Sequence, residues 1–279
     1  MSHSLVEAQQ GRSELEVTRV RHPLKFRLLQ VKRVRPINPH LVCITLTGEA
    51  LADFESASFD DHVKVFFPQP GGSMPVVPEA GPDGPVFDPA KPRPIARDFT
   101  PRRFDRAARE LDIEFALHDA GPATAWAAKA APGDYLGIGG PRGSFVIPTR
   151  FDWHLLVGDE TALPAIARRL EELPAGTRVA ALLEVADPSA RIEFDTRANL
   201  YVQWCYRSES AYAGGDLLLA LRGTYLPDGE GYVWAAGEAA LMRAVRQLLC
   251  NERGIDKRRI RASAYWKRGE QGVHGTIED

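Results

Sequence analysis

The feature that most constrains this chain is a change in the rhythm of its apolar residues near Pro148. From Lys25 to about Ile147 the apolar residues form short runs that Gly, Pro, Asp and Asn separate: FRLLQVKRV, LVCITLTG, HVKVFFP, LDIEFALH and YLGIGG. Short runs with turn residues between them are typical of the strands of a β-barrel or sandwich. We therefore predict an antiparallel β-barrel for this half. A Pro- and Gly-rich segment without a repeating apolar face, Pro68–Pro94, is predicted to be an exposed, mobile excursion.

After Pro148, strand-like runs alternate with helix-like runs. In order, the runs are WHLLVG, TALPAIARRLEEL, RVAALLEV, LYVQWCY, GDLLLAL, YVWAAG, EAALMRAVRQLLC and RASAYW. Such alternation builds an α/β domain whose parallel sheet is covered by helices and binds ligands at the carboxyl ends of its strands. The sequence thus predicts two domains, residues 22–149 and 150–279, after a flexible N-terminus of residues 1–21.

Composition narrows the function classes. A net charge of −2 over 279 residues does not suit a protein that coats nucleic acid or acidic membranes. The chain has no run of about 18 uncharged apolar residues and its first residues are polar, so we expect a cytoplasmic protein without stable membrane insertion. The three cysteines lie far apart with no CxxC pair. The nearest acidic cluster, Asp60–His62, is expected to be a solvated turn before a strand, so no protein metal site is predicted.

The segment Arg97–Thr100 offers the groups that hold a flavin. In a strand, Arg97 and Phe99 point to the same face, and Thr100 adds a hydroxyl or amide beside them. A guanidinium can fork onto a pyrophosphate, an aromatic ring can cover the isoalloxazine, and a hydrogen bond can steady its reactive nitrogen. On its own, this four-residue pattern also fits an ordinary exposed strand.

A second segment, His118–Trp126, ends a predicted strand and opens a short helix through Gly121 and Pro122. The first turn of a helix has free N–H groups that can bind a diphosphate, and Thr124 can add a hydroxyl. An ordinary helix start capped by Thr124 explains the same residues equally well. The two segments together therefore predict a flavin site only if other motifs in the chain support it.

That support comes from a resemblance. The motifs RDFTPRRFD, HDAGPATAWA, GGPRGSF, GDETALPAI, AAGEAALMRAVR and AYWKRG resemble, in this order, those of the siderophore-interacting proteins, relatives of the ferredoxin reductase superfamily. The resemblance runs from about His22 to Gly269. It implies a two-domain ferredoxin-reductase-like fold, with FAD on the N-terminal antiparallel β-barrel and NAD(P) on the C-terminal α/β domain with its parallel sheet. The FAD contacts that it implies are Arg97, Phe99, Thr100, His118, Gly121, Ala123, Thr124 and Trp126. Phe99 stands where relatives usually carry Tyr, which keeps the stacking ring and loses a hydroxyl.

The turn at Gly158–Pro164 is the candidate nucleotide site, because it leads from a predicted strand into a helix. Asp159 and Glu160 would repel a pyrophosphate there, so a purely structural helix cap is the competing interpretation. The nucleotide-binding residues that the resemblance implies are Asp159, Thr161, Gly237 and Glu238.

The nucleotide itself depends on charges near its ribose. Glu184 and Asp187 suit a free hydroxyl, whereas Arg191 and Arg207 suit a 2′-phosphate. The resemblance favours NADPH over NADH, and ferredoxin stays open as an alternative donor.

The resemblance also implies a substrate, a ferric siderophore. Such chelates are bulky and often anionic, so a basic rim beside the flavin would bind them without protein ligands to the iron. The residues that resemble this rim are Lys64, Arg142, Lys267 and Arg268. Each of them also fits an ordinary surface charge.

The implied reaction needs no catalytic side chain: a hydride passes from NAD(P)H to FAD, and single electrons then reduce Fe(III), which releases Fe(II) from the siderophore. Three alternatives stay open. They are a flavin reductase with another acceptor, a reductase with ferredoxin as its donor, and a non-enzymatic siderophore-binding carrier.

Overall fold

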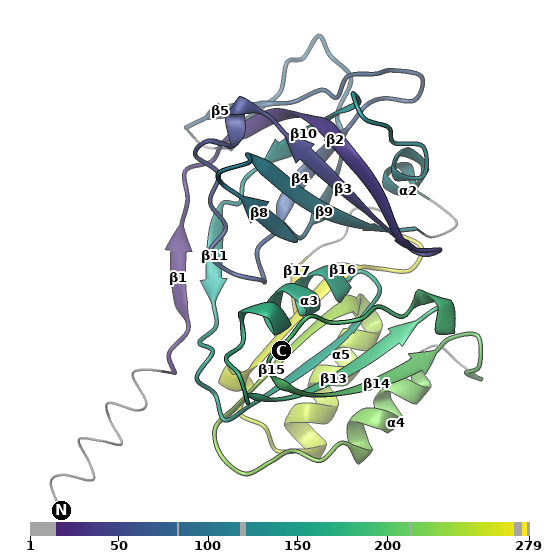
Figure 1. The fold of residues 1–279 in the computed structure, drawn as a ribbon. Helices are drawn as coiled ribbons and strands as arrows, with labels where there is room; N and C mark the ends of the chain where they lie inside the picture. Colours follow the sequence, from purple (N-terminus) through teal and green to yellow (C-terminus); the bar gives the residue numbers. More distant parts are fainter. Residues whose placement is uncertain (1–14, 83, 118–120, 212–213, 271–274, 278–279) are drawn as a thin grey trace, which may run out of the picture.

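The computed structural model describes residues 15–82, 84–117, 121–211, 214–270 and 275–277. Two bodies lie one above the other, a strand-rich upper body and a lower sheet covered by helices (Figure 1). The change from one to the other falls between Val146, where strand β11 ends, and Trp153, where strand β12 begins. The predicted boundary between residues 149 and 150 lies in this connection.

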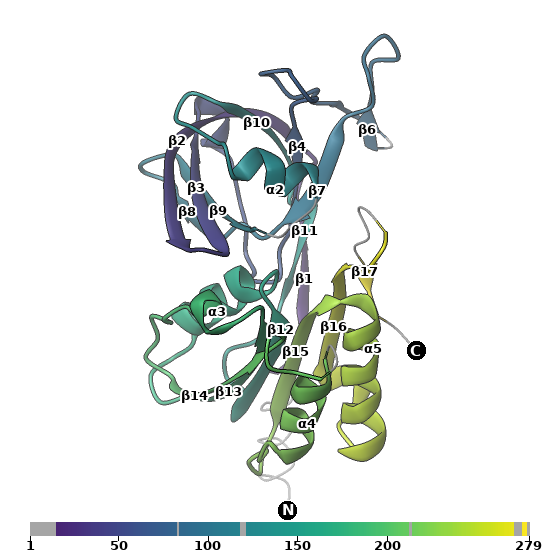
Figure 2. The ribbon, with the colours of Figure 1, turned by 90° about the vertical axis from the view of Figure 1, so that its right-hand side faces the viewer.

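The upper body is a curled antiparallel sheet of seven strands in the order β7-β4-β10-β2-β3-β9-β8. Its edge strand β7 also contacts β9, so the sheet curls toward a barrel, as Figure 2 shows. The strands are β2 (Phe26–Asn38), β3 (Leu41–Thr47), β4 (Val63–Phe67), β7 (Ile95–Phe99), β8 (Arg103–Asp105), β9 (Glu110–Ala116) and β10 (Tyr135–Gly139).

Side chains that alternate along these strands fill the barrel. In β2, Leu29 and Val31 are buried while Leu28 and Gln30 are exposed, which is the alternation that a sheet with one solvated face requires. The short helix α2 (Pro122–Ala127) packs against β9 and β4. The antiparallel sheet predicted from the first half of the sequence is confirmed.

Two smaller ribbons flank the curled sheet. Strand β1 (Thr18–Arg21) pairs antiparallel with β11 (Gly143–Val146), so the last residues of the segment predicted as a flexible N-terminus are a paired strand. The predicted excursion carries a hairpin of β5 (Glu79–Gly81) and β6 (Gly84–Val86). The short helix η1 (Glu49–Leu51) lies earlier in the chain, between β3 and β4.

The lower body is a six-stranded sheet in the order β14-β13-β12-β15-β16-β17. The first five strands are parallel, and β17 is antiparallel to β16. The strands are β12 (Trp153–Asp159), β13 (Arg178–Val185), β14 (Asn199–Tyr206), β15 (Gly231–Glu238), β16 (Ile260–Trp266) and β17 (Gly275–Thr276). The connecting elements are α3 (Leu163–Glu172), η2 (Pro188–Ala190), α4 (Gly215–Gly223), α5 (Ala239–Gln247), η3 (Leu248–Glu252) and η4 (Lys257–Arg259).

Apolar cores cover both faces of this sheet. Helix α3 packs on one face through Ile166 and Leu170, and α4 and α5 pack on the other through residues such as Leu217 and Met242 (Figures 1 and 2). The central strands β12 and β15 are consequently buried almost throughout, as a parallel sheet between helices requires. The predicted parallel α/β arrangement is confirmed.

A buried carboxylate joins the two bodies. Asp60, which precedes β4, accepts hydrogen bonds from Trp234 Nε1 at 2.7 Å and Arg261 Nε at 2.8 Å, and both donors belong to the lower sheet. Its neighbour Asp61 accepts from the Ser144 hydroxyl at 2.8 Å, and burial raises the Asp61 pKa above its ordinary value. Both carboxylates are less than 8 % exposed, so the prediction of a solvated turn was wrong. The turn is an interface between the halves.

Candidate functional site

Arg97 and Phe99 lie on one face of the edge strand β7. Their partners across the ladder are Val65 and Val63, which point into the barrel core. Side chains paired across a ladder share a face, so Arg97 and Phe99 also point to this inner face, at the open edge of the sheet. Both are half-buried, and the Phe99 ring lies 4.5 Å from that of Phe115. The guanidinium and the ring that a flavin needs are therefore neighbours.

Helix α2 reaches the same aromatic cluster. The Trp126 ring lies 5.7 Å from Phe67 and 6.0 Å from Phe115, two rings that also contact Phe99. The helix begins after Gly121, whose φ of 136° favours glycine and which supplies no side-chain cap. Edge-on and tilted aromatic contacts thus hold α2 beside the inner face of β7.

The other predicted residues of this segment are positioned by the same helix. Ala123 and Thr124 lie in its first turn and are half-buried. His118, also predicted to contact the cofactor, lies outside the described residues. The start of α2 and the end of β7 together form the candidate cofactor face.

Thr100 joins this face to the lower sheet. It follows β7, is 6 % exposed and forms a side-chain hydrogen bond with Tyr265 near the end of β16. Burial raises the Tyr265 pKa above its ordinary value, so this phenol stays protonated at neutral pH. The contact brings the carboxyl end of a parallel strand to the end of β7.

The parallel sheet has its topological switch point between β12 and β15. From β12 the chain passes through α3 to β13 on one side, and from β15 it passes through α5 to β16 on the other. Ligands of open α/β sheets bind outside the carboxyl ends of the strands at such a point. The strands end here at Asp159 and Glu238, two of the residues predicted to bind the nucleotide.

Asp159 is the structural centre of the switch point. Its carboxylate is 2 % exposed and accepts four hydrogen bonds. One oxygen accepts from the Thr161 amide at 2.9 Å and the Thr161 hydroxyl at 2.5 Å; the other accepts from Trp266 Nε1 at 2.8 Å and the Glu238 amide at 3.1 Å. Burial raises its pKa to about 6, with hydrogen bonds from Thr161 opposing and the charge of Glu160 adding to the shift. The carboxylate is therefore directed at donors inside the protein.

Gly237 and Glu238 complete this end of the sheet. A Cβ on Gly237 would come within 2.6 Å of an Asp159 oxygen, and its φ of 155° favours glycine. The Glu238 carboxylate caps α5 by accepting from the Ala240 amide at 2.7 Å and the Leu241 amide at 2.9 Å. Glycine is therefore required for the close approach of β15 to Asp159.

Most of the charged residues that were expected to contact the ribose form ion pairs or hydrogen bonds within the protein instead. Arg207 forms an ion pair with Glu160 and lies 3.6 Å from Glu184. Asp187 instead caps η2. Arg191 is exposed, and its guanidinium lies 4.9 Å from the centre of the Tyr206 ring. Arg191 is thus the more accessible of the two arginines.

The predicted basic residues form two groups. In the upper body, Lys64 forms an ion pair with Asp98 at 2.8 Å, on the opposite face of β7 from Phe99. The β10 residue paired with Lys64 is Gly139, three positions before the exposed Arg142.

The second group follows β16. Lys267 forms an ion pair with Glu270, and the backbone amide of Arg268 donates to Glu238 at 3.4 Å. Asp98, the partner of Lys64, is two residues before Thr100, and Lys267 is two residues after Tyr265. One member of each group, Lys64 or Lys267, therefore lies near the junction that Thr100 and Tyr265 form.

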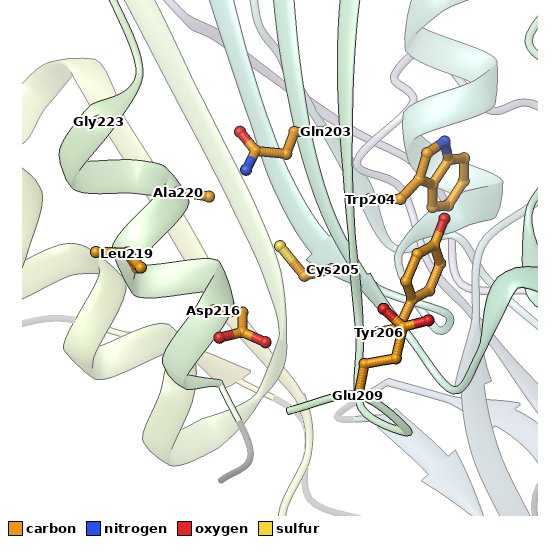
Figure 3. A pocket seen from close by; sticks show the side chains of 9 residues that line it. All are labelled: Gln203, Trp204, Cys205, Tyr206, Glu209, Asp216, Leu219, Ala220 and Gly223. Carbon is orange, nitrogen blue, oxygen red and sulfur yellow. The ribbon is translucent and has the colours of Figure 1, made fainter. Parts of the chain in front are cut away.

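A separate hollow of about 460 Å³ lies between β14 and α4 (Figure 3). Gln203 and Cys205 face α4 there, while Trp204 points to the other side of the strand. The acidic residues Glu209 and Asp216 line it, so it is poorly suited to a phosphate. It contains none of the residues predicted to bind FAD.

The described part of the chain lacks both a membrane-spanning helix and a cluster of metal ligands. None of its helices is both long and apolar enough to cross a membrane. Within the same residues, no group of three or more His, Cys, Asp and Glu side chains could hold a metal ion.

Two aromatic residues have roles that the sequence alone did not indicate. Tyr265 bonds to Thr100, and Trp266 bonds to Asp159, so adjacent residues of β16 connect to the cofactor face and to the switch point. The signal was the AYWKRG motif, in which only the cations were given a role.

Comparisons with known proteins find relatives that match most of the chain. Residues 30–145 match the model of the siderophore-interacting FAD-binding domain, and residues 151–269 match that of the siderophore-interacting protein family. The NADPH-dependent ferric-chelate reductase of Escherichia coli strain K12 is 39 % identical over 253 residues, covering 89 % of this chain and 95 % of the relative.

Solved structures extend the likeness to the fold. A siderophore utilization protein from T. fusca superposes with a TM-score of 0.85 at 43 % identity, covering 92 % of this chain and 98 % of the other. A ferredoxin reductase of carbazole 1,9a-dioxygenase superposes with a TM-score of 0.62 at 17 % identity, covering 86 % of this chain and 68 % of the other. The predicted ferredoxin-reductase-like fold is confirmed.

Proposed function

Because the chain belongs to the siderophore-interacting protein family, we propose that it is an FAD-dependent reductase that takes electrons from NADPH and delivers them to ferric siderophores. One observation carries the proposal. The hydrogen bond between Thr100 and Tyr265 joins the face of Arg97 and Phe99 to the carboxyl ends of the parallel strands. A flavin reductase needs these two regions side by side, because hydride transfer requires contact between donor and acceptor rings.

The barrel edge has the donor set that FAD requires. Arg97 supplies a half-buried cation for the pyrophosphate, the Phe99 ring covers the isoalloxazine, and Thr100 supplies a hydrogen bond at its edge. We assign the diphosphate to the start of α2, with Gly121, Ala123 and Thr124, and a supporting contact to Trp126. When bound, FAD accepts a hydride and releases electrons singly. The domain that we assign to it is residues 22–149.

We assign the nicotinamide to the switch point, in the domain of residues 150–279. Gly237 leaves the end of β15 without a side chain, and the turn containing Thr161 borders it. Glu238 holds the start of α5, so its backbone rather than its carboxylate faces the ligand in this assignment. The residues of this site position two rings and exclude water; none of them transfers a proton.

For the ferric siderophore we propose the two groups of basic residues described above, which are Lys64, Arg142, Lys267 and Arg268. Two cations come from each body, and an anionic chelate between them would be attracted from both sides. Lys64 and Lys267 have carboxylate partners, Asp98 and Glu270, which moderate the local charge. A bound chelate would compete with these exposed ion pairs, which are individually weak.

NADPH is our proposed donor, with the exposed Arg191 as the cation for the 2′-phosphate. We place the reaction in the cytoplasm, in keeping with three cysteines that are free thiols. Cell fractionation tests the location, and the Arg191→Ala variant tests the donor, because it should raise KM for NADPH and leave KM for NADH unchanged.

Turnover across electron acceptors tests the function. The purified protein, NADPH and an Fe(II) trap are combined with ferric siderophores, with free flavin or with an oxidised ferredoxin. Preferred turnover of ferric siderophores supports the proposal. Preference for another acceptor would favour a different flavin reductase, and siderophore binding without any turnover would indicate a carrier.

A further inference from the structure

We propose that Asp159 is a positioning residue of the nicotinamide site, which fixes the Trp266 indole and the Gly237–Glu238 backbone to the end of β12. The inference rests on the proposed function, because it assumes that the nicotinamide binds at this switch point. It assigns a task to a carboxylate that the reaction itself does not use. Asp159 then acts through its neighbours and does not contact the substrate.

The Asp159 carboxylate links the ends of three strands through its hydrogen bonds to Trp266 and the Glu238 amide, and we call this set of contacts the pin. Asp159 is the last residue of β12, Glu238 is the last of β15 and Trp266 is the last of β16. The Glu238 amide and the Trp266 indole both donate to the Asp159 carboxylate. The bonds to Glu238 and Trp266 share one oxygen, whereas the other oxygen is held by Thr161. Because Thr161 fixes the carboxylate from behind, the remaining oxygen has one orientation in which to hold the two donors.

Close packing excludes looser arrangements. Gly237 lies so near that a Cβ there would meet the Asp159 carboxylate at 2.6 Å, so the backbone of β15 lies directly against the pin. Trp266 is half-buried, and its indole nitrogen is committed to Asp159 at 2.8 Å. Loss of the carboxylate would free the backbone and the ring that border the proposed nicotinamide position.

An ionised carboxylate is needed for this role, because all four partners donate hydrogen bonds. Its pKa is raised to about 6, mainly by burial, so it is charged at neutral pH and becomes protonated as the pH falls through about 6. The other charged or titratable groups around it are Glu160, Arg207, Glu238 and Tyr265. Protonation replaces an acceptor by a donor and weakens the pin.

The test is anaerobic stopped-flow reduction of the bound flavin by NADPH in the full-length holoprotein. Asp159→Asn is nearly isosteric, but its NH₂ group cannot accept from Trp266 or Glu238. Trp266→Phe keeps a ring and removes only the donor. Asp256→Asn is the matched control, since Asp256 likewise accepts from the amide two residues later and caps η4, away from the switch point.

We expect both switch-point variants to slow flavin reduction by about tenfold to a hundredfold, as loss of a hydrogen bond to a charged group predicts. The double variant should be no slower than the slower single variant. The FAD dissociation constant and reoxidation of dithionite-reduced enzyme by ferric siderophore should stay at wild-type values. The wild-type and W266F rates should fall below about pH 6, whereas D159N should lack this limb.

A D159N rate and pH profile equal to those of the wild type would overturn the inference while leaving the proposed function intact. If D159N does not fold, a W266F reduction rate equal to that of the wild type overturns it instead. A wild-type flavin that NADPH and NADH both fail to reduce would refute the proposed donor site, and the inference with it. Slowing in D256N equal to that in D159N would show a general loss of stability and also contradict the pin.

Discussion

Asp60→Ala should be among the most destabilising single changes in this chain, because it removes the carboxylate that joins the two bodies. Asp60 is 7 % exposed, Trp234 is 1 % exposed, and the Arg261 side chain is 21 % exposed. The change leaves a buried indole N–H without an acceptor and a largely buried guanidinium without its ion-pair partner. Both consequences act at the interface, where no other described residue replaces the lost oxygens.

The magnitude follows from these two losses. An unsatisfied buried donor costs about 1–3 kcal/mol, and removing one member of a buried ion pair costs about 3–5 kcal/mol. The Arg261 guanidinium keeps its contact with the Phe145 ring, 4.2 Å away, so the terms do not add fully. We expect Asp60→Ala to lower the free energy of unfolding by about 3–5 kcal/mol. Asp60→Asn keeps an acceptor for Trp234 and should cost about half as much.

Urea denaturation, followed in parallel by tryptophan fluorescence and far-UV circular dichroism, measures the effect. Glu252→Ala is the control, because it removes a two-point ion pair with Arg222 in which both side chains are about half exposed. Solvent screens such a pair, so its midpoint should stay near that of the wild type. A loss of less than about 1 kcal/mol in Asp60→Ala would refute the view that this carboxylate holds the bodies together.

Three further changes probe the site and the core. Arg97→Ala should raise the FAD dissociation constant by about tenfold or more, measured by flavin fluorescence, because it removes a charge-assisted contact to the diphosphate; wild-type affinity would exclude Arg97 from the site. Replacing both Lys64 and Arg142 by Ala should raise KM for a ferric siderophore about threefold to tenfold, and added salt should diminish this effect. Reduction of the flavin by NADPH should stay unchanged. An equal effect on both substrates would argue against a siderophore rim. Burial lowers the pKa of His154 to about 3 from 6.5, so unfolded chains bind more protons and stability should decline as the pH falls from 6.5 toward 3. Urea titrations should show a shallower decline in His154→Leu, and parallel curves for the two proteins would contradict this.

The sequence revealed most of the fold because the relevant signals are local. Apolar runs such as RVAALLEV predict a buried parallel strand by themselves, and β13 spans those residues. Strand β1 lacked such a signal. Its four exposed residues become a strand only by pairing with β11, more than a hundred positions later in the chain.

Charged residues were harder to interpret, because their partners are distant in sequence. Asp60 resembled a solvated residue since nothing nearby indicated Trp234 or Arg261. Asp159 posed the opposite difficulty, because a carboxylate at a helix start conflicts with phosphate binding. The structure resolves this conflict by turning the carboxylate inward to Trp266, a contact that depends on tertiary packing alone.

The central claim is that this chain transfers electrons from NADPH through FAD to a ferric siderophore. The most direct measurement is a sequential anaerobic mixing experiment on the FAD-loaded protein: first with NADPH, then with a ferric siderophore and an Fe(II) trap, with the flavin absorbance recorded throughout. We predict that the flavin bleaches with NADPH and recovers its colour with the siderophore as Fe(II) is trapped, with two Fe(II) formed for each flavin by electron balance. A bleached flavin that ferric siderophores fail to reoxidise, or a protein that binds no FAD, would contradict the account.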